Sequence, residues 1–130
     1  MSRDDFSKLT IDILAKRVRH QCSNPGCKQP TIGPNLNGKT TTIGTACHIT
    51  GASPGGPRYE QRLSKEERGC IENGIWLCNN CAKLIDSDIN NYPTRKLITW
   101  KKEAESEALA LINGNEKEPL LPLDFIYPII

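Results

Sequence analysis

This sequence has few aromatic residues and no apolar run long enough to cross a membrane. Aromatic residues make up 5% and apolar residues 37% of its 130 residues, so the hydrophobic core that it can build is modest. The N-terminus, Met-Ser-Arg-Asp-Asp-Phe, lacks the pattern of a signal peptide, and the absence of a long apolar run argues against a membrane span. The formal net charge of +2 permits a nucleic-acid partner without requiring one. We therefore expect one domain of a cytoplasmic protein.

Cysteine, in contrast, is plentiful, with six residues in the chain. In a reducing cytoplasm these thiols are expected to bind metal or stay free rather than form disulfides. Four of them form two close pairs, Cys22 with Cys27 and Cys78 with Cys81, and this spacing is typical of a structural zinc site. Buried or redox-active thiols are the alternative, but no βαβ pattern surrounds the second pair. We expect the two remaining cysteines to be small buried residues.

The first half of the chain predicts a helix, a loop and a strand. Residues 7–20 have a partial helical stripe of apolar residues, with basic residues near the C-terminal end. The prolines, glycines and asparagines of residues 30–39 indicate a loop. Residues 40–49 alternate in polarity as a strand does. This alternation places Cys47 on the more apolar face of the strand and His48 on the other.

The second half predicts a long loop and then a strand with two helices. Residues 50–60 are rich in glycine and proline, which indicates an irregular loop. Residues 64–68 have the spacing of a capping box and predict a short helix. We expect a strand over residues 74–78 and a helix over 81–85, followed by a longer helix over 94–112 that a glycine ends. These elements predict an α+β fold.

The C-terminal end of the chain differs in composition from the rest. Residues 114–130 are apolar and contain three prolines, which are incompatible with a long helix. We therefore expect one domain over residues 1–113, followed by this apolar, proline-rich tail. An exposed tail of this kind would favour aggregation. We expect it to pack on this domain or on a partner chain, or to be a linker to a further domain.

Four motifs resemble those of the HNH endonucleases, which are also called ββα-metal nucleases. They lie at residues 46–49, 52–59, 71–78 and 81–86, and the resemblance covers roughly residues 5–108. Within that family the chain is most similar to the N-terminal HNH effector domains of bacterial anti-phage systems (CBASS-type, HNH-SAVED nucleases). There the nuclease is fused to a sensor domain for a cyclic oligonucleotide. The resemblance implies an α+β fold with a ββα-metal core, a four-cysteine zinc knuckle and flanking helices.

The resemblance also implies roles for two residues of the loop that the cysteine pairs enclose. Phosphodiester hydrolysis needs an activated water and stabilisation of charge on the phosphate. The family's general base is the histidine of the first strand, which is His48 here. The family's asparagine before the second strand fixes the loop that supports this histidine, and it corresponds to Asn73. We therefore expect His48 and Asn73 to be catalytic residues.

The chain departs from the family's commoner pattern at the catalytic metal site. Ala82 follows the last cysteine, where many relatives have a histidine. Asp86 lies four residues further on, on the same face of a helix, and Asp88 is a less well-placed second candidate. Carboxylates suit Mg²⁺ or Mn²⁺. Arg58 is a candidate for substrate binding through a phosphate, and a packing or salt-bridge role is an equal alternative for it.

The resemblance implies a metal-dependent endonuclease that cleaves double-stranded DNA without sequence specificity. We expect it to act in the cytoplasm, without a membrane partner, as an effector of anti-phage defence. The expected cofactors are a structural Zn²⁺ and a catalytic Mg²⁺ or Mn²⁺. One such site cuts one strand, so we expect a homo-oligomer, with a fused or associated cyclic-oligonucleotide sensor domain as a further partner. The alternatives are a catalytically inactive, zinc-stabilised nucleic-acid-binding module and a structural interaction module. The pairing of His48 with Asn73 favours the enzyme.

Overall fold

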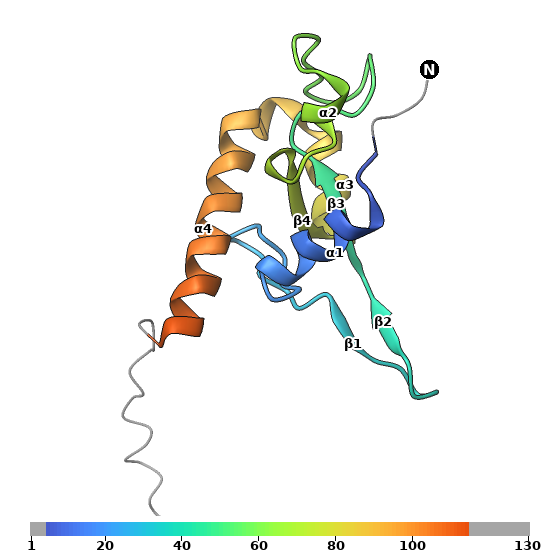
Figure 1. The fold of residues 1–130 in the computed structure, drawn as a ribbon, viewed down its shortest axis with the longest axis vertical. Helices are drawn as coiled ribbons and strands as arrows, with labels where there is room; N and C mark the ends of the chain where they lie inside the picture. The colour runs from blue at the N-terminus through green and yellow to red at the C-terminus, as the bar shows by residue number, and fades with distance from the viewer. Residues whose placement is uncertain (1–4, 115–130) are drawn as a thin grey trace, which may run out of the picture.

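The computed structural model describes residues 5–114, which form a small α+β fold with two antiparallel two-stranded sheets. Figure 1 shows the longest helix along one side of the larger sheet and the smaller sheet projecting from the body. The expected boundary between residues 113 and 114 falls at the end of this helix, whereas the tail lies outside the described residues. The elements are α1 (Lys8–Arg17), β1 (Ile32–Pro34), β2 (Thr40–Thr42), β3 (Gly44–His48), α2 (Lys65–Arg68), β4 (Gly74–Cys78), α3 (Asn79–Ser87) and α4 (Thr94–Asn113), with 3₁₀ turns η1 (Ile71–Asn73) and η2 (Ile89–Asn91).

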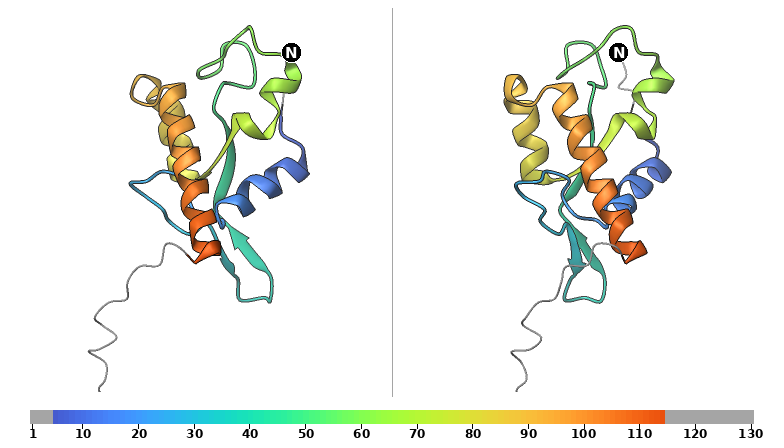
Figure 2. Two further views of the ribbon diagram at one scale, coloured as in Figure 1. Left: turned by 60° about the vertical axis from the view of Figure 1, so that its left-hand side comes forward. Right: turned by 90° about the vertical axis from the view of Figure 1, so that its left-hand side faces the viewer.

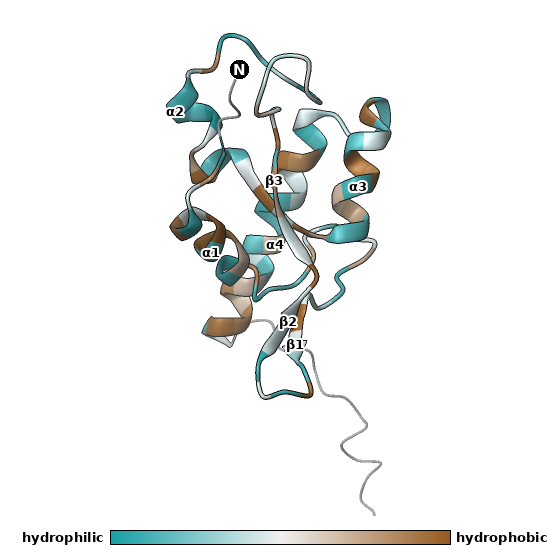
Figure 3. Ribbon diagram, turned by 90° about the vertical axis from the view of Figure 1, so that its right-hand side faces the viewer, coloured by the Kyte–Doolittle hydropathy of each residue, from teal (hydrophilic) through white to brown (hydrophobic). Residues whose placement is uncertain are grey.

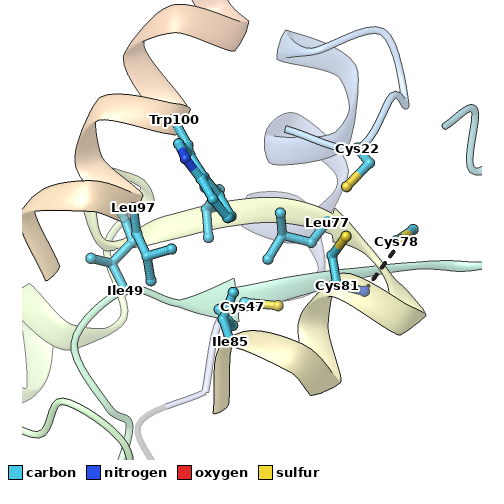
Figure 4. Packing of buried hydrophobic residues seen from close by; sticks show 10 residues of the cluster. Cys22, Cys47, Ile49, Leu77, Cys78, Cys81, Ile85, Leu97 and Trp100 are labelled. Carbon is cyan, nitrogen blue, oxygen red and sulfur yellow. Dashed lines mark hydrogen bonds between the residues drawn. The ribbon is translucent and has the colours of Figure 1, made fainter. Parts of the chain in front are cut away.

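The hairpin of β3 and β4 is the centre of the fold. Its register pairs Gly44 with Cys78 and His48 with Gly74, and every residue of β4 is buried. Helix α1 packs on one face of this hairpin and α3 on the other (Figures 2 and 3). Helix α4 contributes Leu97 and Trp100 to the cluster on the α3 side and Ala104 to the one on the α1 side. The main apolar cluster lies on the α3 and α4 side, where Figure 4 shows its packing; it contains Cys22, Cys47, Ile49, Ile75, Leu77, Cys78, Cys81, Ile85, Leu97 and Trp100.

Local sequence signals account for most of the helix ends. Ser7 Oγ accepts a hydrogen bond from Thr10 N at the start of α1. Helix α1 ends earlier than predicted because Arg19 and His20 adopt positive φ angles of 60° and 58°. The capping box predicted before α2 is present, and α4 ends at Gly114 with a φ of 76°, which glycine adopts without strain.

The region from residue 30 to residue 49 differs from the prediction. The expected loop over 30–39 contains β1, and the expected strand over 40–49 is divided into β2 and β3. The division occurs at Ile43, whose N–H donates to Thr31 O while its carbonyl accepts from Asn79 N. The two halves of the expected strand therefore pair with different partners, and β1 is too short to be recognised from alternation alone.

We expect Gly44→Ala to destabilise the protein, because a Cβ at this position would overlap the indole ring of Trp76. Relieving such a clash in a packed core costs about 1–3 kcal/mol. Urea denaturation of the variant would measure this loss. The control is Gly33→Ala, because no atom lies within 4 Å of a Cβ at that position. Equal stabilities of the two variants would contradict this account of Gly44.

None of the helices between residues 5 and 114 combines the length and the apolar character needed to cross a lipid bilayer.

Candidate metal centre and candidate active site

The structure gathers the four paired cysteines at one place, as the sequence predicts. The Sγ atoms of Cys22, Cys27, Cys78 and Cys81 all lie within 4.8 Å of one another, and those of Cys27 and Cys78 are 3.9 Å apart. A tetrahedral zinc ion with Zn–S bonds of about 2.3 Å places its sulfur ligands roughly 3.8 Å apart. All four cysteines are free of disulfides. They are therefore positioned to bind a metal ion, and zinc fits the donor set.

Each cysteine pair is held by a different local structure. Asn24 organises the first turn, because its carbonyl accepts from Cys27 N and its side-chain oxygen accepts from Gly26 N. The second pair opens α3, where Cys78 Sγ accepts from Cys81 N at 3.4 Å (Figure 4). Asn24 Nδ2 also donates to Cys81 Sγ at 3.4 Å. Such N–H···S hydrogen bonds orient the sulfur ligands of a metal ion and stabilise their negative charge.

The environment of these thiols makes metal binding depend on pH. Burial raises the pKa of Cys22 and of Cys81. At Cys78 burial also acts to raise the pKa, but hydrogen bonds from Cys81 and the neighbouring thiols outweigh it and lower the pKa. Protons must leave when the thiols bind a metal ion, so metal affinity increases as the pH rises.

A second site lies where β3, the loop after it and α3 meet. A pocket of about 160 Å³ opens there, and both His48 and Asp86 line it. Ala82 lines it too, so Asp86 lies on the same face of α3, as the helical spacing predicts. The other lining residues are Thr45, Ala46, Cys47, Gly51, Ala52, Ser53, Gly56 and Pro57.

Asp88, the second predicted carboxylate, is not among the residues that line this pocket. It lies at the C-cap of α3, and its Oδ2 accepts a hydrogen bond of 2.7 Å from Asn91 Nδ2. Within residues 5–114, the pocket does not bring together three or more histidine, cysteine, aspartate or glutamate side chains in metal-binding geometry. A cation beside Asp86 would therefore complete its coordination with water or with substrate oxygens.

The imidazole ring of His48 is stacked on Phe6. The ring centroids are 4.0 Å apart and the ring planes differ by 11°, a contact that restricts the orientation of the imidazole. Phe6 is buried and directly precedes Ser7, the N-cap of α1. Phe6 was not among the residues expected at this site, although an apolar residue immediately before an N-cap is a known packing signal.

Asn73 connects the loop after β3 to the segment before β4. Its Oδ1 accepts from Thr50 N, while its Nδ2 donates to Thr50 O and to Arg68 O, at 2.9–3.0 Å. Its backbone carbonyl also accepts from Ile49 N, one residue after His48. The buried Asn73 side chain thus ties the residues that follow His48 to the segment before β4.

We expect Asn73→Ala to destabilise the protein by about 2–4 kcal/mol, because it leaves buried backbone groups of Thr50 and Arg68 without partners. Urea denaturation would give the change in the free energy of unfolding. Asn91→Ala is the matched control, since Asn91 is exposed and its amide donates to the Asp88 side chain. If both alanine variants unfold at the same urea concentration, Asn73 is not the structural tie described here.

The Arg58 side chain is buried and does not point outward as a phosphate ligand would. Its Nε donates to Ile49 O at 2.8 Å, one Nη donates to Ile85 O at 3.0 Å, and the other binds Asp86 Oδ1 at 2.8 Å. Of the two alternatives for Arg58, this geometry supports packing with a salt bridge. It does not support direct contact with a substrate phosphate.

Cys47 lies at the inner side of the pocket, packed in the apolar core. Burial, followed by the negative charge of Asp86, raises the pKa of its thiol to about 12. The thiol is therefore uncharged near neutral pH, and it acts as a small apolar residue, as expected. Cys70, the other unpaired cysteine, is only half-buried, contrary to expectation, and its Sγ donates to Glu67 O.

Comparison with known protein families finds no family profile that matches this chain. Among curated proteins, a subtilisin-like protease of Arabidopsis thaliana, SBT3.16, is 26% identical over 117 residues. The match covers 88% of this chain but only 15% of the protease. At this identity and coverage the match does not establish membership of the protease family.

Proposed function

We propose that this chain is an HNH endonuclease domain, a ββα-metal nuclease that hydrolyses the phosphodiester bonds of double-stranded DNA without sequence specificity. The observation that carries the proposal is the meeting of His48 and Asp86 in one pocket. The pocket is lined by β3, the loop after it and α3. Strand β4 pairs with β3 and directly precedes α3, so the element order is the one that the name ββα describes. Asn73 supports the loop next to His48.

In the proposed mechanism, the His48 imidazole accepts a proton from the attacking water near neutral pH. Stacking on Phe6 holds the imidazole ring in one plane while it does so. Asp86 would hold the catalytic Mg²⁺ or Mn²⁺, which supplies charge stabilisation at the scissile phosphate when bound. The four cysteines would hold a structural Zn²⁺ at the start of α3, away from this proton transfer.

The wider context of the proposal rests on the sequence resemblance. We propose an effector of bacterial anti-phage defence that acts in the cytoplasm, with a fused or associated sensor domain for a cyclic oligonucleotide. The six free cysteines are compatible with a reducing compartment. Cleavage of both DNA strands would require two copies of the pocket, so we propose a homo-oligomer as the active form.

Cleavage of supercoiled plasmid DNA tests the function directly. Zinc-loaded protein would be incubated with the plasmid in buffer cleared of divalent ions, and then with added Mg²⁺ or Mn²⁺. Nicked or linear DNA that forms only with the added ion supports the proposal, provided that the zinc content is the same in all reactions. Intact plasmid under every condition, including a preparation with the sensor domain and its ligand, would refute the nuclease.

A second candidate function is a catalytically inactive, zinc-stabilised module that binds nucleic acid. Ala82 favours it, because the pocket lacks the histidine that many HNH relatives have there. This alternative predicts DNA binding without cleavage, and it predicts that replacing His48 leaves the affinity for DNA unchanged. Measuring DNA binding and cleavage on the same preparation separates the two functions.

A further inference from the structure

The Arg58 side chain joins three segments of the chain below the proposed active-site pocket. It is 3% exposed, and its guanidinium reaches the end of β3 through Ile49 O and the last turn of α3 through Ile85 O. A longer hydrogen bond of 3.5 Å reaches Tyr92 O, after η2. A buried guanidinium needs such acceptors, because an unpaired buried charge is strongly destabilising.

The loop after β3 is built so that Arg58 can reach this position. Gly51 packs so closely against the Pro57 carbonyl that a Cβ would overlap it, and Gly55 has a φ of 83°. Arg58 itself has a φ of 56°, which is costly for a residue with a side chain and is found where the surrounding structure enforces it. The loop therefore turns back on itself, so that Gly51 and Pro57 line the pocket while Arg58 lies beneath it.

The contact between Arg58 and Asp86 involves only one of the two carboxylate oxygens. Asp86 Oδ1 accepts from Arg58 Nη2 at 2.8 Å, and the Asp86 side chain is 50% exposed. Among residues 5–114, no hydrogen bond or ion pair engages Asp86 Oδ2. One oxygen of this half-exposed carboxylate is thus held by the buried guanidinium, and the other has no partner among these residues.

We propose that Arg58 is a positioning residue that holds the Asp86 carboxylate with one oxygen directed to a divalent cation at the pocket. The guanidinium fork suits this role because its separate N–H groups bind Ile49 O, Ile85 O and Asp86 at the same time. A lysine at this position keeps the positive charge but cannot reproduce the fork. The inference rests on the proposed function for its effect on cleavage, whereas its effect on cation binding is independent of cleavage.

The test compares Arg58→Lys, Asp86→Asn and the double variant in the full chain, with Mn²⁺ as the probe. Mn²⁺ binding to zinc-loaded protein is followed by electron paramagnetic resonance, and plasmid cleavage is measured over a range of Mn²⁺ concentrations. The matched control is Arg62→Lys, because Arg62 belongs to the same loop but is 85% exposed and pairs with Glu60. Zinc content and circular dichroism check that each variant is folded.

We expect Arg58→Lys to weaken Mn²⁺ binding about tenfold or more, as the loss of a residue that orients a metal ligand does. Cleavage should recover as Mn²⁺ is raised, and in the Asp86→Asn background Arg58→Lys should cause no further loss. Wild-type Mn²⁺ affinity in Arg58→Lys would overturn the inference. The inference would also be overturned if Arg58→Lys lowered Mn²⁺ affinity and cleavage as much in the Asp86→Asn background as in the wild type. Mn²⁺ binding that does not depend on Asp86 would overturn it as well.

A second variant covers the case in which Arg58→Lys fails to fold. Asp86→Glu keeps the charge but moves the carboxylate by one methylene, at a side chain that is half-exposed. We expect this variant to lose Mn²⁺ affinity, and unchanged affinity would overturn the inference. Asp86-dependent Mn²⁺ binding without any DNA cleavage would refute the proposed nuclease and leave the inference standing. If folded Arg58→Lys cleaves DNA at the wild-type rate at every Mn²⁺ concentration, the inference is refuted and the proposed nuclease stands.

Discussion

His48→Asn is expected to lower the rate of DNA cleavage by a factor of about 10²–10⁴, the usual contribution of a general base. The His48 side chain lines the pocket together with Asp86, and an asparagine in its place cannot take up a proton near neutral pH. The substitution removes the stacking contact with Phe6 but leaves the backbone pairing of His48 with Gly74 intact. Plasmid cleavage at saturating Mg²⁺ or Mn²⁺, beside a thermal denaturation curve, measures the effect.

The chain supplies a matched control in its second histidine. His20 lies after α1 with a φ of 58°, a conformation that asparagine tolerates, and its ring makes an edge contact with Trp76 rather than lining the pocket. His20→Asn should therefore cleave DNA at close to the wild-type rate. If His48→Asn retains wild-type activity, or if both variants lose it equally, His48 is not the general base.

Cys78→Ser is expected to abolish metal binding at the four-cysteine cluster and to unfold most of the domain. Cys78 ends β4 and caps α3, so its loss affects the central hairpin and the helix that carries Asp86. Structural zinc sites contribute about 10–16 kcal/mol of apparent binding free energy in small zinc-dependent domains, which is comparable to the whole stability of a domain. Elemental analysis for zinc and circular dichroism during heating would measure both losses.

Cys70→Ser provides the comparison for this substitution. Cys70 is half-buried, lies outside the four-cysteine cluster and donates to Glu67 O, a hydrogen bond that serine can reproduce. This variant should keep one equivalent of metal and melt close to the wild-type temperature. A Cys78→Ser protein that remains folded without metal would show that the apolar core is sufficient by itself.

Features encoded in short stretches of sequence were predicted well. The two cysteine pairs and the capping box of Ser64 and Glu67 depend on residues a few positions apart, and the structure confirms that the four cysteines are gathered and that the box is formed. The strand over 74–78 is confirmed with the same bounds. The expectation of an α+β fold is confirmed as well, whereas its assignment to the HNH family stays a prediction.

What the sequence did not reveal depends on contacts between distant segments. Nothing near Phe6 indicates that it stacks on His48, because only the packing of α1 against the hairpin brings the two rings together. The partners of Arg58 belong to the residue after β3, to α3 and to the segment after η2. These acceptors decide whether the arginine side chain faces solvent or core, and the sequence around Arg58 does not predict them.

A metal ion held by the four-cysteine cluster would cross-link distant parts of this chain. Cys27 and Cys78 are 51 positions apart, and tying such a loop reduces the conformational freedom of the unfolded chain by roughly 4 kcal/mol when the tie is permanent. A disulfide would provide that tie only under oxidising conditions, whereas a metal ion provides it in the presence of reductant. The stability of this domain is therefore expected to follow the concentration of free metal by mass action. If zinc is that metal, a fall in the free zinc concentration of the cell would lower the folded fraction of this domain.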